Sequence, residues 1–300
     1  MLKRNQSCTD RPLLDSANVL VDMQVAGGTA CQCTPTPARE CAVARAALTT
    51  LQAMSLSTPA QGTRDRLVSH FWSGDAIRSR SVSGVVLSGA LDVPVPPARL
   101  AADWEREVSS RLGLEPGDVE ALPLARARAR WPDYKHCVQA VADWMRMLGL
   151  PDVLASSDVA LMACRGARYH HDGAQYGGAA FCNLFMSEDK GLDVHFPGTG
   201  HRIPLARGTA LIFDTGQPHA VIRRGDSGGF DADDFGPGQD CTQLFLTWEL
   251  PIEDAHVARA LSIAFDVDPA VSARLNDEQV WVNGTPASVC PQSGRWRTGG

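Results

Sequence analysis

The chain has 300 residues, of which 44% are hydrophobic and 21% are charged, a composition typical of globular proteins. Its formal net charge of -6 argues against a nucleic-acid-binding surface, which usually carries a basic patch. No run approaches the roughly 18 consecutive apolar residues that a membrane span requires. Polar residues follow the basic start of the chain where a secretion signal would have an apolar core. We therefore expect a cytoplasmic protein that binds neither nucleic acid nor membranes.

The nine cysteines are an odd number scattered over a long chain, which favours free thiols in a reducing compartment. A zinc cluster built from Cys31, Cys33, Cys8 and Cys41 is a less favoured alternative, because paired Cys-x-x-Cys knuckles are missing.

The first 155 residues are predicted to form a mainly helical region. Apolar residues recur at helical spacing over 37–54, over 98–112 and after Trp131-Pro132-Asp133, where Gly149 and Pro151 supply a stop. Residues 83–89 predict one short buried strand between glycines. The basic run over 124–130 is interpreted as the solvated face of a helix or loop, and a patch for acidic substrates is the minority interpretation.

From residue 156 onward the pattern changes to short apolar segments separated by Gly, Asp and Pro. Such spacing favours a β-sandwich or jelly roll over alternating strands and helices. The predicted strands cover 158–164, 179–186, 192–196, 202–205, 209–213, 220–224 and 242–250. Residues 251–300 are predicted to add a helix over 251–265 and a hairpin at Asn283-Gly284.

His170, Asp172 and His219 are the candidate metal ligands. Two imidazoles and one carboxylate suit Fe(II) and leave coordination positions open. Residues two apart on a strand point the same way, so His170 and Asp172 can bind one ion while His171 points to the other face. His219 must then come from a neighbouring strand. An exposed polar turn with an incidental His219 remains the alternative, and His195 and His201 are weaker candidates that could line a pocket.

The Tyr169-His170-His171-Asp172 segment and the apolar strand leading to Pro218-His219-Ala220-Val221 resemble the Fe(II)/2-oxoglutarate-dependent oxygenase superfamily. The resemblance covers residues 156–250. It implies an α+β protein with a double-stranded β-helix (jelly-roll or cupin-like) core. It further implies that His170, Asp172 and His219 bind Fe(II), with 2-oxoglutarate and O2 as co-substrates for hydroxylation or a related C–H oxidation. Asp172 favours this over halogenation, because related halogenases have a small residue there.

The resemblance also implies an arginine for the distal carboxylate of 2-oxoglutarate, since a guanidinium can bind a carboxylate through two hydrogen bonds. The corresponding position appears as Gln243, a neutral amide. Arg223, Arg224, Arg202 and Lys190 are the alternative cations, and Asn183 is a further polar contact. Arg223 shares the strand parity of His219, although it lies four residues further along.

The sequence thus predicts three parts: a helical region over 1–155, a catalytic jelly-roll core over 156–250, and an extension over 251–300. The favoured function is oxidation of a small molecule coupled to decarboxylation of 2-oxoglutarate. A cupin-like dioxygenase that does not use 2-oxoglutarate and a non-catalytic jelly-roll binding module remain as alternatives. The substrate and the oligomeric state are not predicted.

Overall fold

The structure is a computed structural model that describes residues 65–108, 114–225, 229–236 and 238–299. The helix predicted over 37–54 and the cysteines at positions 8, 31, 33 and 41 lie outside the described residues. The described cysteines, Cys137, Cys164, Cys182, Cys241 and Cys290, are free thiols, as predicted. No described helix is long and apolar enough to cross a membrane.

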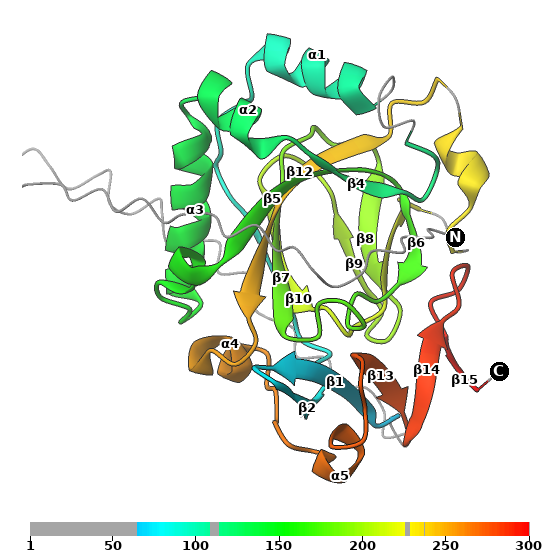
Figure 1. Ribbon diagram of the computed structural model, residues 1–300. Helices are drawn as coiled ribbons and strands as arrows, with labels where there is room; N and C mark the ends of the chain where they lie inside the picture. The colour runs from blue at the N-terminus through cyan, green and yellow to red at the C-terminus, as the bar shows by residue number, and fades with distance from the viewer. Residues whose placement is uncertain (1–64, 109–113, 226–228, 237, 300) are drawn as a thin grey trace, which may run out of the picture. The chain divides into compact units, whose positions relative to one another are not determined.

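Two antiparallel sheets form a sandwich that carries the candidate metal ligands (Figure 1). The six-stranded sheet has the order β3 (Val86–Ala90), β10 (Thr209–Asp214), β7 (Ala179–Phe185), β12 (Thr242–Pro251), β5 (Asp158–Arg165) and β4 (Val119–Leu122). The four-stranded sheet has the order β6 (Ala167–His170), β11 (His219–Arg223), β8 (Leu192–Phe196) and β9 (His201–Pro204). The chain passes back and forth between the two sheets from β5 to β12, which is compatible with a jelly roll. The predicted antiparallel β core is confirmed.

The space between the two sheets is filled by apolar side chains, among them Phe185, Phe196, Phe213 and Phe245. Along strand β12, alternate side chains face the helices and the four-stranded sheet. Leu246, Trp248 and Leu250 pack into the cluster on the other side of the sheet. Gln243, Thr247 and Glu249 therefore share the side of Phe245, toward the four-stranded sheet.

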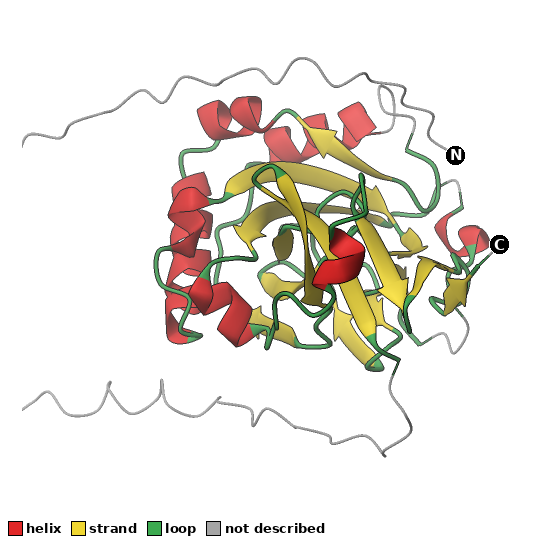
Figure 2. Cartoon of the chain, turned by 60° about the horizontal axis from the view of Figure 1, so that its bottom comes forward, coloured by secondary structure: helices red, strands yellow, loops and turns green. Residues whose placement is uncertain are grey.

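Three helices cover the outer side of the six-stranded sheet: α1 (Ala98–Glu107), α2 (Leu124–Arg130) and α3 (Tyr134–Met147) (Figure 2). Their buried residues Trp104, Val141 and Trp144 belong to the same apolar cluster as Trp248 of β12. The helix predicted over 98–112 is confirmed over Ala98–Glu107, and residues 109–112 lie outside the described residues. The helix predicted after Asp133 is confirmed as Tyr134–Met147. The short 3-10 helix η2 (Val153–Ser156) then leads into β5.

A third sheet joins both ends of the described chain, in the order β15 (Trp296–Thr298), β14 (Thr285–Val289), β13 (Gln279–Val282), β1 (Leu67–Ser73) and β2 (Ala76–Ser81). The hairpin at Asn283-Gly284 is confirmed, and both residues have positive φ, 51° and 81°, as a tight two-residue turn requires. The 3-10 helix η3 (Ala232–Phe235) lies between β11 and β12, and the helices α4 (Ala255–Ala260) and α5 (Pro269–Ser272) lie between β12 and β13.

Strands β1, β2 and β3 precede the helices in the region predicted to be mainly helical. Only β3 was anticipated, through the strand predicted over 83–89. Strand β1 escapes a pattern search because Val68, Ser69, His70 and Phe71 are consecutive buried residues, so polar and apolar positions do not alternate.

Candidate metal centre

The three candidate ligands meet at one end of the sandwich. His170 ends β6, Asp172 follows two residues later, and His219 begins β11 as the register partner of His170. The Asp172 carboxylate oxygens lie 3.6 Å from His170 Nε2 and 3.5 Å from His219 Nε2. The two imidazole ring centroids are 4.4 Å apart. One ligand atom from each residue lies within 4.8 Å of the others, which suits a single ion.

The hydrogen bonds of the imidazoles fix which nitrogen faces the centre. His170 Nδ1 lies 2.7 Å from the Arg168 carbonyl oxygen, and His219 Nδ1 lies 3.0 Å from the Gln217 carbonyl oxygen. A carbonyl oxygen can only accept, so each Nδ1 carries the proton and donates it. In neutral imidazoles with this tautomer, both Nε2 atoms are lone-pair acceptors, and they face a carboxylate that is also an acceptor. A cation bound between them would satisfy all three acceptors.

His219 is prepared for metal binding by its surroundings. Burial is the main cause that lowers the pKa of its imidazole to about 4, and the neighbouring His170 acts in the same direction. Asp172 and the Gln217 carbonyl oppose this shift without overcoming it. His219 is therefore neutral near pH 7, the state in which its Nε2 can bind a metal ion.

His171 lies apart from the three ligands, as the strand parity predicted. Its ring packs against Trp296 of β15 with centroids 5.3 Å apart, and burial lowers the pKa of its imidazole. Its Nδ1 is buried and has no hydrogen-bond partner among the described residues.

The two weaker histidine candidates do not join the centre. His195 lies on the outer side of the four-stranded sheet, where its Nδ1 is 2.5 Å from the Tyr169 hydroxyl. His201 is exposed at the start of β9. His195 therefore does not face the space between the two sheets, where β8 contributes Leu192, Val194 and Phe196.

A buried ion pair that the sequence did not reveal supports the loops carrying Asp172 and His219. Arg80 of β2 and Asp214 of β10 are both fully buried, and two hydrogen bonds of 2.7 and 2.9 Å join them. Asp214 also accepts hydrogen bonds from the backbone N–H groups of Ser83 and Gly216. Arg80 Nε donates to the Gly177 carbonyl. The pair therefore ties the segment before His219 to the segment after Asp172.

Thr215, next to Asp214, completes this connection. Its carbonyl accepts the backbone N–H of Asp172 at 2.8 Å. Its hydroxyl lies 2.7 and 2.8 Å from the carbonyl oxygens of Tyr176 and Ala179, which share its single donor. The backbone at Asp172 is thus set by contacts from β2 and β10 rather than by its own strand alone.

The cations considered for a co-substrate carboxylate are already engaged. Arg223 donates to the carbonyls of Lys190 and Asp234 and contacts the Gln239 amide. Arg224 forms ion pairs with Asp189 and Asp193, both at 2.8 Å.

Lys190 pairs with Asp240. Arg202 is the register partner of His195, so it shares the outer side of the four-stranded sheet. Among the described candidates, none presents a free cation between the two sheets.

Gln243 and Asn183 do face the space between the sheets. Gln243 is fully buried, and neither its amide nitrogen nor its amide oxygen has a partner among the described residues. Asn183 is 8% exposed, and its Oδ1 is likewise buried without a partner. Both neutral amides are therefore available to a bound molecule, and neither carries a charge.

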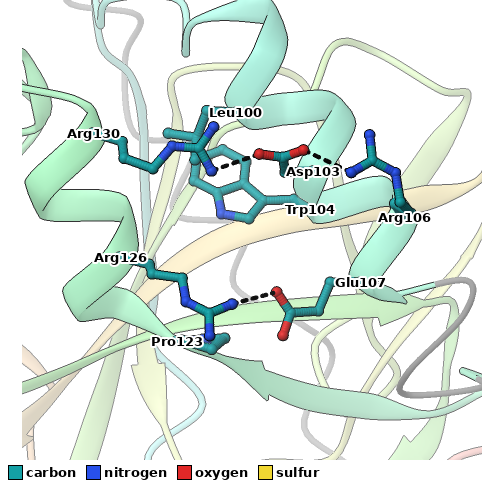
Figure 3. Close-up of a pocket in the computed structure, with 8 residues that line it drawn as sticks. All are labelled: Leu100, Asp103, Trp104, Arg106, Glu107, Pro123, Arg126 and Arg130. Atoms are coloured by element: carbon teal, nitrogen blue, oxygen red, sulfur yellow. Dashed lines mark hydrogen bonds and ion pairs between the residues drawn. The ribbon is translucent and has the colours of Figure 1, made fainter.

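The arginine run contributes to a different feature. Figure 3 shows a pocket between α1 and α2, lined in part by Trp104, Arg126 and Arg130. Arg130 lies 2.5 Å from the Asp103 carboxylate and Arg126 lies 3.8 Å from that of Glu107. The run thus forms a helix in which Arg126 and Arg130 pair with acidic residues of α1, whereas Arg128 lies over the Tyr134 ring.

No protein-family model matches the chain, and no curated protein sequence matches it significantly. Among solved structures, a prolyl-4-hydroxylase from Pseudomonas putida is 18% identical, with a TM-score of 0.32, over 55% of this chain and 91% of its own. The viral collagen prolyl hydroxylase from Paramecium Bursaria Chlorella virus-1 is 9% identical, with a TM-score of 0.32, over 55% and 88%.

A protein from Caulobacter crescentus described as a 2OG-Fe(II) oxygenase family member is 11% identical, with a TM-score of 0.23, over 65% of this chain and 66% of its own. The structural neighbours of the chain thus include prolyl hydroxylases and a further 2OG-Fe(II) oxygenase. Similarities of this strength carry no argument about function.

Proposed function

We propose that the protein is a mononuclear non-haem iron oxygenase whose Fe(II) is bound by His170, Asp172 and His219. The observation that carries the proposal is the convergence of three acceptors, two Nε2 atoms and one carboxylate, with no donor between them. Two imidazoles with one carboxylate are the ligand set that suits Fe(II) and leaves positions open for co-substrate and O2. A closed structural zinc site would instead use four protein ligands, usually with thiolates.

In this proposal 2-oxoglutarate is the co-substrate and a small molecule is the substrate. The bound iron would supply the redox chemistry that couples oxidative decarboxylation of 2-oxoglutarate to hydroxylation or a related oxidation of a C–H bond. Residues 156–250 would form the catalytic core as a double-stranded β-helix, and residues 1–155 and 251–300 would support it. The alternation of β5 to β12 between the two sheets supports this assignment.

The chain's own residues orient and shield the ligands. The carbonyls of Arg168 and Gln217 hold the Nδ1 protons of the two imidazoles, which fixes the orientation of each ring. Phe213 and Phe196 pack around His219, with ring centroids 4.8 and 6.0 Å from its own. Their apolar rings shield His219, whereas the side chains of His170 and Asp172 are more exposed, at 38% and 21%.

One observation favours a second candidate, a cupin-like dioxygenase that does not use 2-oxoglutarate. A distal carboxylate between the sheets needs a partner with a positive charge, and the described candidates offer none. Gln243 could hydrogen-bond that carboxylate, but a neutral amide gives a weaker interaction than a guanidinium.

Anaerobic titration with Fe(II), with and without 2-oxoglutarate, tests both candidates. The favoured function predicts one iron per chain and a visible charge-transfer band that depends on 2-oxoglutarate. His219→Ala should abolish the band, whereas the matched control His195→Ala should keep it. Iron binding with neither a band nor succinate formation would support the second candidate, and the absence of stoichiometric iron would overturn both.

A further inference from the structure

Two carboxylates, the half-buried Glu249 and the exposed Asp158, lie at the end of the six-stranded sheet on the side that faces the four-stranded sheet, without a cationic partner among the described residues. Glu249 of β12 and Asp158 of β5 are register partners, so their side chains stand next to each other. Glu249 shares the side of Phe245, toward the four-stranded sheet, because Trp248 and Leu250 occupy the helix-covered side. Burial and the neighbouring Asp158 both raise the pKa of the Glu249 carboxyl, so its charge is costly in the free protein.

A continuous row of aromatic rings connects these carboxylates with the metal centre. Phe213 lies 4.8 Å from His219 and 6.1 Å from Phe181, measured between ring centroids. Phe181 is in turn the register partner of Glu249. Tyr176 contacts Phe181 edge-on at 5.2 Å, and its backbone N–H donates to the Asp172 carbonyl. Glu249 therefore belongs to the same end of the sandwich as the three ligands.

Asn183 supplies a second, independent sign of a ligand at this place. It lies two residues from Phe181 on β7, and its register partner Thr247 lies two residues from Glu249 on β12. All four side chains therefore point to the same side. No donor from the described part of the chain reaches the buried Asn183 Oδ1, and a buried acceptor left unpaired costs about 1–3 kcal/mol.

The chemistry of this surface selects one class of ligand. Carboxylates and an amide oxygen accept hydrogen bonds, and the faces of Tyr176 and Phe181 attract cations. An anionic ligand would be repelled by Glu249 and Asp158, and an apolar ligand would leave Asn183 unpaired. A second metal ion is not the answer, because the described residues form only one group of three ligands close enough for an ion, His170, Asp172 and His219.

We propose that the substrate carries a protonated amine, which Glu249 binds beside Phe181 and Tyr176, and that its other end reaches the His170–Asp172–His219 centre. Asp158 adds negative charge behind Glu249, and Asn183 accepts a hydrogen bond from the ligand. This inference rests on the proposed function, because it assigns the substrate class of the same site. Specificity then comes from the six-stranded sheet, whereas the iron ligands come from β6, β11 and the loop after β6.

Binding of three probes of equal length tests the inference: n-pentylammonium, pentan-1-ol and pentanoate. Calorimetry with the wild-type protein, metal-free and loaded with Mn(II), should show n-pentylammonium binding about 10- to 100-fold more tightly than pentan-1-ol, the range expected for a hydrogen bond to a charged group. Pentanoate should bind least. In the Mn(II)-loaded protein, the terminal methyl protons of n-pentylammonium should relax faster than those next to nitrogen, because the amine lies at the far end of the site.

Glu249→Gln should remove the preference for n-pentylammonium while the Mn(II) stoichiometry stays at one. Asp158→Asn, at an exposed position where folding is not at risk, should weaken it by a smaller factor. The matched control is Glu120→Gln, a carboxylate of β4 on the same sheet whose register partner Ala163 packs into the helix-covered cluster.

Equal binding of all three probes, or an unchanged preference in Glu249→Gln, would overturn the cation site. A preference for n-pentylammonium in a protein that binds no metal would instead overturn the proposed function and leave the cation site standing.

Discussion

Two charged clusters lie close together at one end of the sandwich, and they differ in how their polar atoms are paired. Arg80 and Asp214 are fully buried, and together with nearby backbone groups they satisfy each other. His170, Asp172 and His219 present three acceptors to one another and no donor. Arg80 with Asp214 forms a closed cluster, because its buried polar atoms are paired as buried groups normally are. His170, Asp172 and His219 form an open cluster, because 38% and 21% of the His170 and Asp172 side chains are exposed and the three acceptors converge on one point that a cation can reach. The open cluster is therefore the candidate binding site, and the closed cluster supports the loops around it.

The largest expected effect is on metal affinity at the open cluster. Asp172→Ala removes its carboxylate and should weaken Mn(II) or Fe(II) binding by more than the ~10–100-fold that changes outside the ligand set produce. The unfolding free energy of the metal-free protein should hardly fall, because the lost group had no donor. Equilibrium dialysis and urea unfolding measure the two quantities, with the exposed Asp240→Ala as control. If Asp172→Ala bound the metal as tightly as the wild-type protein, Asp172 would not be a ligand and the open cluster would not be a metal site.

The closed cluster should show the opposite behaviour. Arg80→Met leaves Asp214 as an unpaired buried charge and should cost about 3–5 kcal/mol of unfolding free energy, whereas Arg80→Met with Asp214→Leu should cost less. Arg78→Met on the same strand is the matched control, because Arg78 pairs with Glu253 and Asp266 at the surface and should cost about 0–1 kcal/mol. Urea unfolding measures these free energies. Similar losses for Arg78→Met and Arg80→Met would contradict the supporting role of the buried pair.

Metal addition should stabilise the protein only through the open cluster. At a free metal concentration of 100 times Kd, the unfolding free energy should rise by about 2.7 kcal/mol. This gain should disappear in His219→Ala and persist in His171→Ala, whose ring packs against Trp296 instead. Thermal unfolding with and without Mn(II) measures it. A gain that survives in His219→Ala would place the metal elsewhere.

The smallest effect concerns acid stability and His70, which belongs to neither cluster. Burial lowers the pKa of His70 below its usual 6.5, although Asp268 opposes the shift, and its Nδ1 lies 3.0 Å from the Ser272 hydroxyl. The unfolded chain therefore binds this proton more readily. The His70 contribution to stability is present above about pH 6.5 and is lost as the pH falls toward the lower, folded-state pKa.

The slope from one such group cannot exceed about 1.4 kcal/mol per pH unit. His70→Gln should unfold with a flatter pH dependence below pH 6.5, and an unchanged slope in urea unfolding would show that His70 is not responsible.

Local spacing explains why the grouping of His170, Asp172 and His219 could be predicted. The two-residue period of a strand brings His170 and Asp172 to one side and sends His171 to the other. The Asn283-Gly284 hairpin was similarly predictable, because its turn needs only two residues.

Contacts between distant segments were not predictable. Arg80 and Asp214 are 134 residues apart, and the residues around each give no signal that the two side chains pair. Arg223 shares the strand parity of His219, which made it a candidate for a co-substrate contact. Its carbonyl partners on Lys190 and Asp234, however, come from loops whose paths depend on the whole fold. Glu249 had a visible signal, an acidic residue at an interior position of a predicted strand, which could have marked the proposed cation site.

The pairing of β1 with β13 has a consequence for shortened versions of the protein. Leu67, Val68, Ser69 and His70 bond to residues 279–282, so the last quarter of the chain supplies the neighbour of β1. A protein ending before residue 275 would leave the N–H and C=O groups along that side of β1 without a neighbour. Such a bare strand edge is a template for pairing with another copy. Trimming the carboxyl end should therefore yield aggregates that grow by strand addition rather than a smaller active core.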